Sequence, residues 1–138
     1  MKVLIDTNVI LDALAKRPLF YDNAEKIFFL AAEEKIKAFI TASSVMDISY
    51  LIRKHLRSSE EAKLALLKLF TLFQIIDVTG EDCKKALEQN ITDYEDALLA
   101  TCARRNKIEY IITRNIKDFT NSPVPAILPE RFVSTHPY

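Results

Sequence analysis

The chain has 138 residues, of which 49% are hydrophobic and 28% are charged, and its 19 basic residues balance its 19 acidic ones. This size is typical of one water-soluble domain, so we expect residues 1–138 to form a single domain, and a net charge of zero excludes a protein that coats nucleic acid through overall positive charge. The single glycine, Gly80, excludes Walker and dinucleotide-binding loops, and Cys83 and Cys102 lack the spacing of zinc fingers or thioredoxin-like redox sites.

Short apolar runs alternate with amphipathic stretches along the chain, which predicts strands separated by helices. The N-terminal part predicts a strand at Lys2–Ile5, helices at Thr7–Lys16 and Asp22–Glu34, and a second strand at Ala38–Ile40. The next predicted helix is capped by Ser43 or Ser44 and runs to about Arg57. The C-terminal part begins with a predicted helix that Ser58 or Ser59 caps, followed by a strand at Gln74–Val78. Thr79 then caps a helix over 80–87, and Thr92 caps a helix over 93–106. The last two predicted strands are Glu109–Ile112 and Val124–Leu128. Asp82 and Glu95 stand three residues after these two threonines, as in capping boxes.

Strands that alternate with helices favour a parallel sheet, because the chain must cross back between parallel strands. We therefore predict an α/β fold: a three-layer α/β/α sandwich with a central parallel sheet of four to five strands. In such folds the carboxyl ends of strands and the amino ends of helices share one edge, where ligands bind. Four separate segments place acid or amide side chains at this edge: Asp6, Asp47, Asp93 with Asp96, and Asn115 with Asp118.

Asp96 and Asp6 are the strongest candidates for functional acids. Asp96 begins a stripe with helical spacing whose other members, Leu99, Ala100 and Ala103, are apolar and face the core. An unpaired carboxylate there would be costly, so we expect a metal ion or a hydrogen-bond donor beside it. Asp6 lies at the edge itself, directly after the first strand, although it can also cap the helix that follows.

The other acids have explanations that require no function. The helix dipole suffices to explain Asp93 and Glu95, which lie in a first helical turn. Asp47 is the exception: the serines before it are better caps, so its position favours a functional role. Asp118 can close a turn through its side chain. Two further acids are expected on solvated helix surface: Asp12 and Asp22.

Carboxylates that converge repel one another unless a cation joins them. Oxygen ligands from aspartate and asparagine suit Mg²⁺ or Mn²⁺ better than zinc. Such ions activate water and hold a phosphodiester for in-line attack. The composition of the predicted site therefore indicates metal-dependent phosphoryl chemistry, and a nuclease in particular.

Four segments, taken in order, resemble the motifs of the PIN domain family, metal-dependent ribonucleases that include the VapC-type toxins. MKVLIDTNVILD at 1–12 resembles the family's N-terminal signature, and ASSVMDI at 42–48 lies where the family places its second acid. DYEDALLATCA at 93–103 resembles the third motif, and IITRNIKDF at 111–119 resembles the last. The resemblance spans nearly the whole chain.

The resemblance implies a catalytic set of four acids and a bound Mg²⁺ or Mn²⁺. The four acids are Asp6, Asp47, Asp96 and Asp118. Asp6 and Asp96 would hold the metal together with Asp118, or with Asp93 as a substitute for it. Asp47 stands where the toxins often have glutamate, so its shorter side chain leaves open whether it binds the metal directly or through water.

The same resemblance implies a set of residues that organise the site and bind the substrate. Asn8 would organise the turn around Asp6, and Thr113 and Asn115 would orient water or a phosphate oxygen. Asn115 replaces an acid that many of the toxins carry. Arg114 adjoins the acids and would bind RNA, which we expect to be single-stranded.

Other basic and apolar residues suggest partners. Arg53, Lys54 and Arg57 suit either RNA binding or the carboxyl end of a helix, whereas Arg104, Arg105 and Lys107 are expected on solvated surface. The stretch from Leu64 to Phe73 is so rich in leucine and phenylalanine that it suggests a subunit contact. The resemblance implies a homodimer and an antitoxin protein that binds a hydrophobic groove.

Two other function classes stay open. A phosphotransfer domain of the receiver type, or an aspartyl phosphatase, would use a similar acid pocket, but Thr7 and Asn8 replace the D-x-D pattern that the phosphatase needs. A binding module that retains the fold and lacks efficient chemistry would also accommodate Asp47 and Asn115.

The N-terminal apolar run is interrupted by Asp6 and Asp12, so no secretory signal is predicted. The most apolar stretch, Leu64–Ile76, contains Lys68 and is shorter than a membrane span. We therefore expect a cytoplasmic protein with no membrane association.

Overall fold

The computed structural model describes residues 1–136. One parallel sheet runs through its centre in the order β3-β2-β1-β4-β5, which confirms the predicted α/β class and the predicted number of strands. The strands are β1 Lys2–Ile5, β2 Lys37–Thr41, β3 Gln74–Ile76, β4 Tyr110–Ile112 and β5 Ala126–Ile127.

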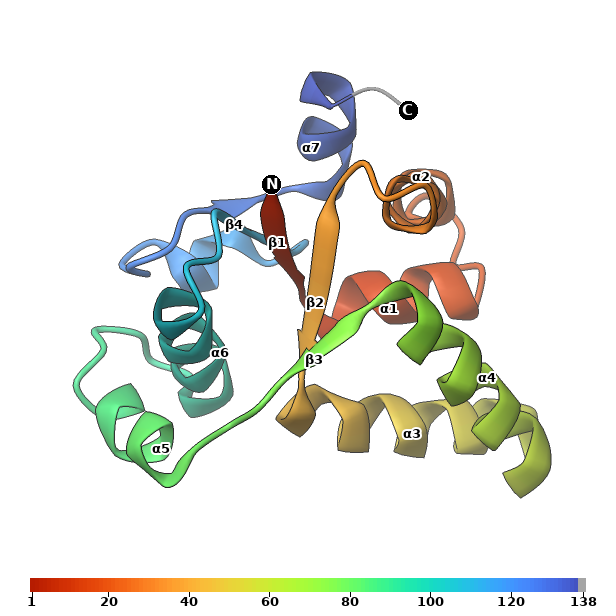
Figure 1. The fold of residues 1–138 in the computed structure, drawn as a ribbon, viewed down its shortest axis with the longest axis horizontal. Coiled ribbons are helices and arrows are strands. Elements are labelled where there is room, and N and C mark those ends of the chain that lie inside the picture. Colours follow the sequence, from red (N-terminus) through yellow and green to blue (C-terminus); the bar gives the residue numbers. More distant parts are fainter. Residues whose placement is uncertain (137–138) are drawn as a thin grey trace.

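Helices cover both faces of this sheet, as the three-layer prediction requires (Figure 1). In Figure 1, α1, α2 and α4 lie to the right of the sheet, and α5 and α6 lie to its left. The helices are α1 Thr7–Leu14, α2 Tyr21–Ala32, α3 Ala42–Leu56, α4 Ser59–Leu72, α5 Gly80–Ala86, α6 Tyr94–Arg105 and α7 Pro129–Thr135, and a 3₁₀ turn, η1, spans Ile116–Phe119.

Alternation along the buried strands divides the core between the two faces. Val3 and Ile5 of β1 belong to the cluster that packs with α1, α2, α3, α4 and α7, whereas Leu4 belongs to the cluster that packs with α6. All three side chains are fully buried. Each face therefore buries its own apolar layer, and the edge where the strands end is left for a site.

Most helix starts agree with the expected caps, and two differ. Ser58 caps α4, and Thr79 forms a complete capping box with Asp82 at the start of α5, as predicted. Thr41, not Ser43 or Ser44, caps α3. The prediction that Thr92 caps the next helix was wrong, because α6 begins at Tyr94 and Asp93 is its cap.

The carboxyl ends of β1 and β2 lead directly into the amino ends of α1 and α3, and in Figure 1 α3 begins at the lower centre, where β2 ends. The backbone joins neighbouring segments there, since the Asp6 amide donates to the Ile112 carbonyl at 3.0 Å. No helix within residues 1–136 is long and apolar enough to cross a membrane.

Candidate functional site

Asp6 is fixed at the end of β1 by hydrogen bonds to both oxygens of its side chain. Its Oδ1 accepts from the Thr7 amide at 2.8 Å, which makes Asp6 the cap of α1. Its Oδ2 accepts from Thr113 Oγ1 at 2.8 Å and from Asn8 Nδ2 at 3.4 Å. Burial raises the pKa of Asp6, while the hydrogen bonds from Thr113 and Thr7 act in the opposite direction. This carboxylate is oriented before any ligand arrives.

The segment that follows β4 supplies the donors that orient Asp6. Thr113 is fully buried, and its hydroxyl accepts from the Asn115 amide at 3.0 Å while donating to Asp6. The Arg114 amide donates to Asn8 Oδ1 at 3.3 Å. Thr113 and Arg114 are therefore both bonded to the turn that begins α1. Asn115, which ends the segment, is exposed.

The first turn of α6 brings three further acids to the same edge. Asp93 Oδ1 accepts from the Asp96 amide at 3.0 Å, so one oxygen of Asp93 serves as the helix cap. Burial raises the pKa of Asp96 to about 7, with further contributions from the negative charges of Asp6, Asp93, Asp118 and Glu95. Asp96, which we selected for its place on the apolar stripe, therefore lies within the electrostatic reach of four other carboxyl groups.

Glu95 is a member of the acid group that the sequence did not distinguish from a helix-dipole residue. A hydrogen bond with the Asp47 side chain raises the pKa of Glu95 to about 7, assisted by burial and by the charges of Asp47, Asp93 and Asp6. This contact joins the start of α3 to the start of α6. The spacing of the capping pattern gave no signal for it, because the partner lies on a helix 48 residues away in the chain.

A cleft of about 420 Å³ opens beside these acids. Asp93 and Asp96 line one wall, and Asp118 and Lys117 of η1 line another. Among the lining residues Lys117 carries the positive charge, and the others are one apolar residue, Ile91, and four polar ones: Asn90, Thr92, Thr120 and Asn121. With three aspartates against one lysine the cleft is acidic, so an anionic chain would need a cation between it and the carboxylates.

The acid group has the donor chemistry of a hard-cation site, because its members offer carboxylate oxygens whose charges raise one another's pKa. Within residues 1–136 no three histidine, cysteine, aspartate or glutamate side chains are already grouped closely enough to enclose a metal ion. Asp47 and Asp118 are exposed, so rotation of their side chains leaves the core undisturbed. The donor set thus fits Mg²⁺ or Mn²⁺.

Asp12 lies where the sequence did not suggest, and it pairs with Arg114. The prediction that Asp12 is on solvated surface was wrong, because its side chain is only 1% exposed. It accepts from Arg114 Nε at 2.7 Å and Nη2 at 3.2 Å, and from Arg17 Nη1 at 3.4 Å. The guanidinium of Arg114 also lies 4.0 Å from the centre of the Phe20 ring.

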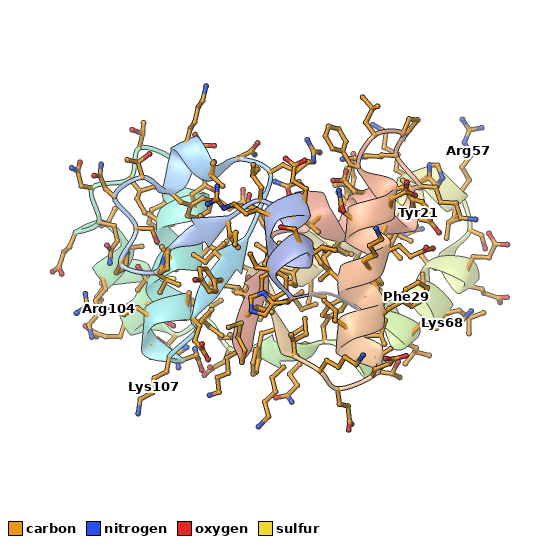
Figure 2. All side chains as sticks on the ribbon, turned by 90° about the horizontal axis from the view of Figure 1, so that it is seen from above. Tyr21, Phe29, Arg57, Lys68, Arg104 and Lys107 are labelled. Atoms are coloured by element: carbon orange, nitrogen blue, oxygen red, sulfur yellow. The ribbon has the colours of Figure 1, made fainter. Side chains whose placement is uncertain are left out.

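Three of the exposed basic residues considered above, Arg57, Arg104 and Lys107, lie at the ends of the molecule. In Figure 2, Arg57 points outward at one end, whereas Arg104 and Lys107 point outward at the other. Arg105 is exposed, as predicted, and its guanidinium is also bonded to Asp82 at 2.9 Å and to Asp77 at 3.1 Å, so it joins α6 to the start of α5.

A family model described as the PIN domain matches residues 2–117, from β1 into η1. The chain belongs to the PIN domain family. The matched range contains Asp6 after β1, Asp47 of α3 and the acids at the start of α6, and it ends one residue before Asp118. A search of curated proteins finds no match.

Solved structures similar to this PIN domain include several toxin–antitoxin proteins. VapBC2 from Rickettsia felis, bound to a DNA fragment of its promoter, is 22% identical, with a TM-score of 0.69 over 93% of this chain and 98% of that one. A toxin–antitoxin complex from Klebsiella pneumoniae is 23% identical, with a TM-score of 0.66 over 92% and 97%. VapC20 of Mycobacterium tuberculosis, described as a sarcin–ricin loop cleaving toxin, is 16% identical, with a TM-score of 0.61 over 79% and 86%. These similarities show a shared fold.

Proposed function

We propose that this PIN domain is a Mg²⁺- or Mn²⁺-dependent endoribonuclease that hydrolyses RNA phosphodiesters, and that it is the toxin of a toxin–antitoxin pair. The observation that carries the proposal is the convergence of acids from α1, α3, α6 and η1 at one edge of the sheet, beside a polar cleft. Acids that raise one another's pKa are held together at a cost, which a bound cation removes.

We assign the cation to Asp6, Asp96 and Asp118, with Asp93 as the substitute ligand. Asp47 would support the site through its contact with Glu95. A bound Mg²⁺ or Mn²⁺ supplies activation of water and stabilisation of the charge that develops on the phosphate. The residues that line the cleft include no serine or cysteine. This agrees with attack by water, without a covalent bond to the protein.

The protein's own groups divide between holding the acids and binding the substrate. Thr113 and Asn8 orient Asp6, because their side chains donate to its Oδ2. We assign the RNA phosphates to Lys117 and Asn115, whose side chains are exposed beside the cleft and after β4. Arg114 belongs with the first group, since the Asp12 carboxylate and the Phe20 ring hold its guanidinium.

The toxin assignment is supported by the similar structures and by an apolar groove on α4. The similar proteins from R. felis and K. pneumoniae are toxin–antitoxin complexes. In this chain, Leu14, Phe28 and Leu69 contribute to a groove of about 390 Å³ between α1, α2 and α4, and Leu64 and Leu67 leave α4 with exposed apolar surface. We propose that an antitoxin covers this groove, and that the exposed face of α4 that carries Leu67, outside the groove, contacts a second copy of the chain in a cytoplasmic homodimer.

Cleavage of a mixed-sequence, end-labelled, single-stranded RNA tests the proposed activity. We expect cutting with Mg²⁺ or Mn²⁺, none in EDTA, and a loss of at least about 100-fold in Asp96→Asn, because that carboxylate is a proposed ligand. Asp22→Asn is the matched control: it removes an exposed carboxylate from the first turn of α2 and should cut like wild type.

Two outcomes would reject the proposal. Cutting that survives both EDTA and Asp96→Asn would indicate a contaminant or a different mechanism. No cutting by folded protein, purified free of bound inhibitor, would favour an RNA- or protein-binding module of the PIN fold.

A further inference from the structure

Asp12 and Arg114 form an ion pair that links α1 to the segment after β4. Asp12 is buried, and Arg114 approaches it side-on with two nitrogens, Nε at 2.7 Å and Nη2 at 3.2 Å. The two residues are 102 positions apart in the sequence. A paired, two-bond arginine–carboxylate contact fixes direction as well as distance, so it holds one backbone segment in a defined place against the other.

The segment held in this way is the one that orients Asp6. Thr113, directly before Arg114, donates to Asp6 at 2.8 Å, and the Arg114 amide itself donates to Asn8 at 3.3 Å. Asn115, directly after it, donates its amide to Thr113 at 3.0 Å. Arg114 therefore anchors this segment to α1, because its side chain is bonded to Asp12.

Binding RNA through the Nε–Nη2 edge of its guanidinium would require Arg114 to break these contacts. Its side chain is 26% exposed, its fork is occupied by Asp12, and one face of the guanidinium lies against the Phe20 ring. Moving the guanidinium toward a phosphate would leave the Asp12 carboxylate, 1% exposed, with only the 3.4 Å contact to Arg17. Removing one partner of a buried pair is strongly unfavourable.

We infer that Asp12 and Arg114 are positioning residues, whose ion pair holds the segment 113–115 so that Thr113 keeps Asp6 in its orientation. The geometric part of this inference is independent of the reaction, and its effect on turnover rests on the proposed ribonuclease function.

Arg114→Lys is the test variant, because it keeps the positive charge and loses the two-bond contact. Hydrogen–deuterium exchange in peptides that cover 113–118 should become about tenfold faster, while peptides of α6 keep their wild-type rates. Arg17→Lys is the matched exchange control, since Arg17 touches the same carboxylate through one long contact, and its exchange should stay within about twofold of wild type. If Arg114→Lys does not fold, Asp12→Asn, which keeps an oxygen for Arg114, takes its place.

RNA cleavage separates a positioning role from direct RNA contact. A positioning residue predicts that Arg114→Lys lowers kcat about tenfold or more, leaves KM within about twofold, and does not change the salt dependence of RNA binding. An RNA contact predicts a raised KM, a weaker salt dependence and unchanged exchange, and that combination would overturn the inference. If wild-type protein cuts no RNA, the proposed function fails, and the exchange experiment still decides whether the pair holds the segment.

Discussion

Asp96→Asn should make the cation-free protein more stable even though it removes a proposed catalytic acid. Burial and four neighbouring acids raise the pKa of Asp96 to about 7, so its charged form is disfavoured in the folded state. Asparagine has nearly the same shape and no charge, so it relieves that penalty without leaving a cavity.

The size of the effect follows from the pKa shift. A change from 3.8 to about 7 is about three pH units, or roughly 4 kcal/mol at most. Because Asp96 is partly exposed, solvent screening reduces the expected gain in unfolding free energy to about 2 kcal/mol. For 138 residues, an unfolding entropy of about 2.1 cal/mol/K per residue converts this gain into a rise in Tm of roughly 7 °C.

The pH dependence of the effect has a defined sign. Below about pH 4 the Asp96 carboxyl is protonated in both folded and unfolded states, so the charge contributes no penalty. Between pH 4 and 7 the folded state binds more protons, and wild-type stability therefore falls as the pH rises through that window. The advantage of Asp96→Asn should thus be small at pH 4.5 and complete at pH 8.

Differential scanning calorimetry in EDTA at pH 4.5, 6 and 8 measures this advantage, with Asp22→Asn as the control for loss of an exposed helical carboxylate. A gain that is equal at all three pH values would refute the electrostatic reasoning. So would a variant that is less stable than wild type at pH 8.

Three other substitutions test contacts at the site, between α5 and α6, and on the surface of α4. Thr113→Val removes a buried hydroxyl that bonds both Asp6 and a backbone amide, so urea unfolding should show a loss of about 1–3 kcal/mol. Burial alone would raise the pKa of Asp82, but hydrogen bonds from Arg105 and Thr79 lower it to about 2. Asp82→Asn should therefore lower the free energy of unfolding by about 2 kcal/mol at pH 7. This loss should become progressively smaller as the pH falls from 4 to 2. Leu67→Glu places a charge on the exposed apolar face of α4, and sedimentation velocity should show a monomer if that face forms the homodimer contact.

Local patterns were sufficient to predict the framework. The apolar run Lys2–Ile5 became β1, and Ser58 and Thr79 became caps, because short-range hydrogen bonds and apolar alternation determine these features. The shared edge followed from the parallel topology, and it placed Asp6 and Asp96 within each other's electrostatic reach.

Competing local signals explain the error at the start of α6. Thr92 with Glu95 and Asp93 with Asp96 are both acceptable cap pairs, one residue apart. The structure uses Asp93, which turns Glu95 toward Asp47 instead of back to the helix end. Local spacing cannot choose between the two, because the choice depends on what packs against the helix.

A long-range ion pair explains the error at Asp12. Asp12 is buried because Arg114, 102 positions away in the sequence, is bonded to it. The pairing of Arg105 with Asp82 and Asp77 was likewise not predicted, although Arg105 is exposed as expected. A charged residue on a helix is ordinarily exposed, so the pattern alone favours the surface. Only the tertiary arrangement identifies such pairs.

Binding of Mn²⁺, followed by electron paramagnetic resonance of the free ion, tests most directly whether the acid group holds a catalytic cation. Saturable binding to wild-type protein and to Asp22→Asn is expected, with an affinity at least about tenfold lower in Asp96→Asn. Equal binding by wild type and Asp96→Asn, or no binding by any of the three, would contradict a cation site at this edge of the sheet.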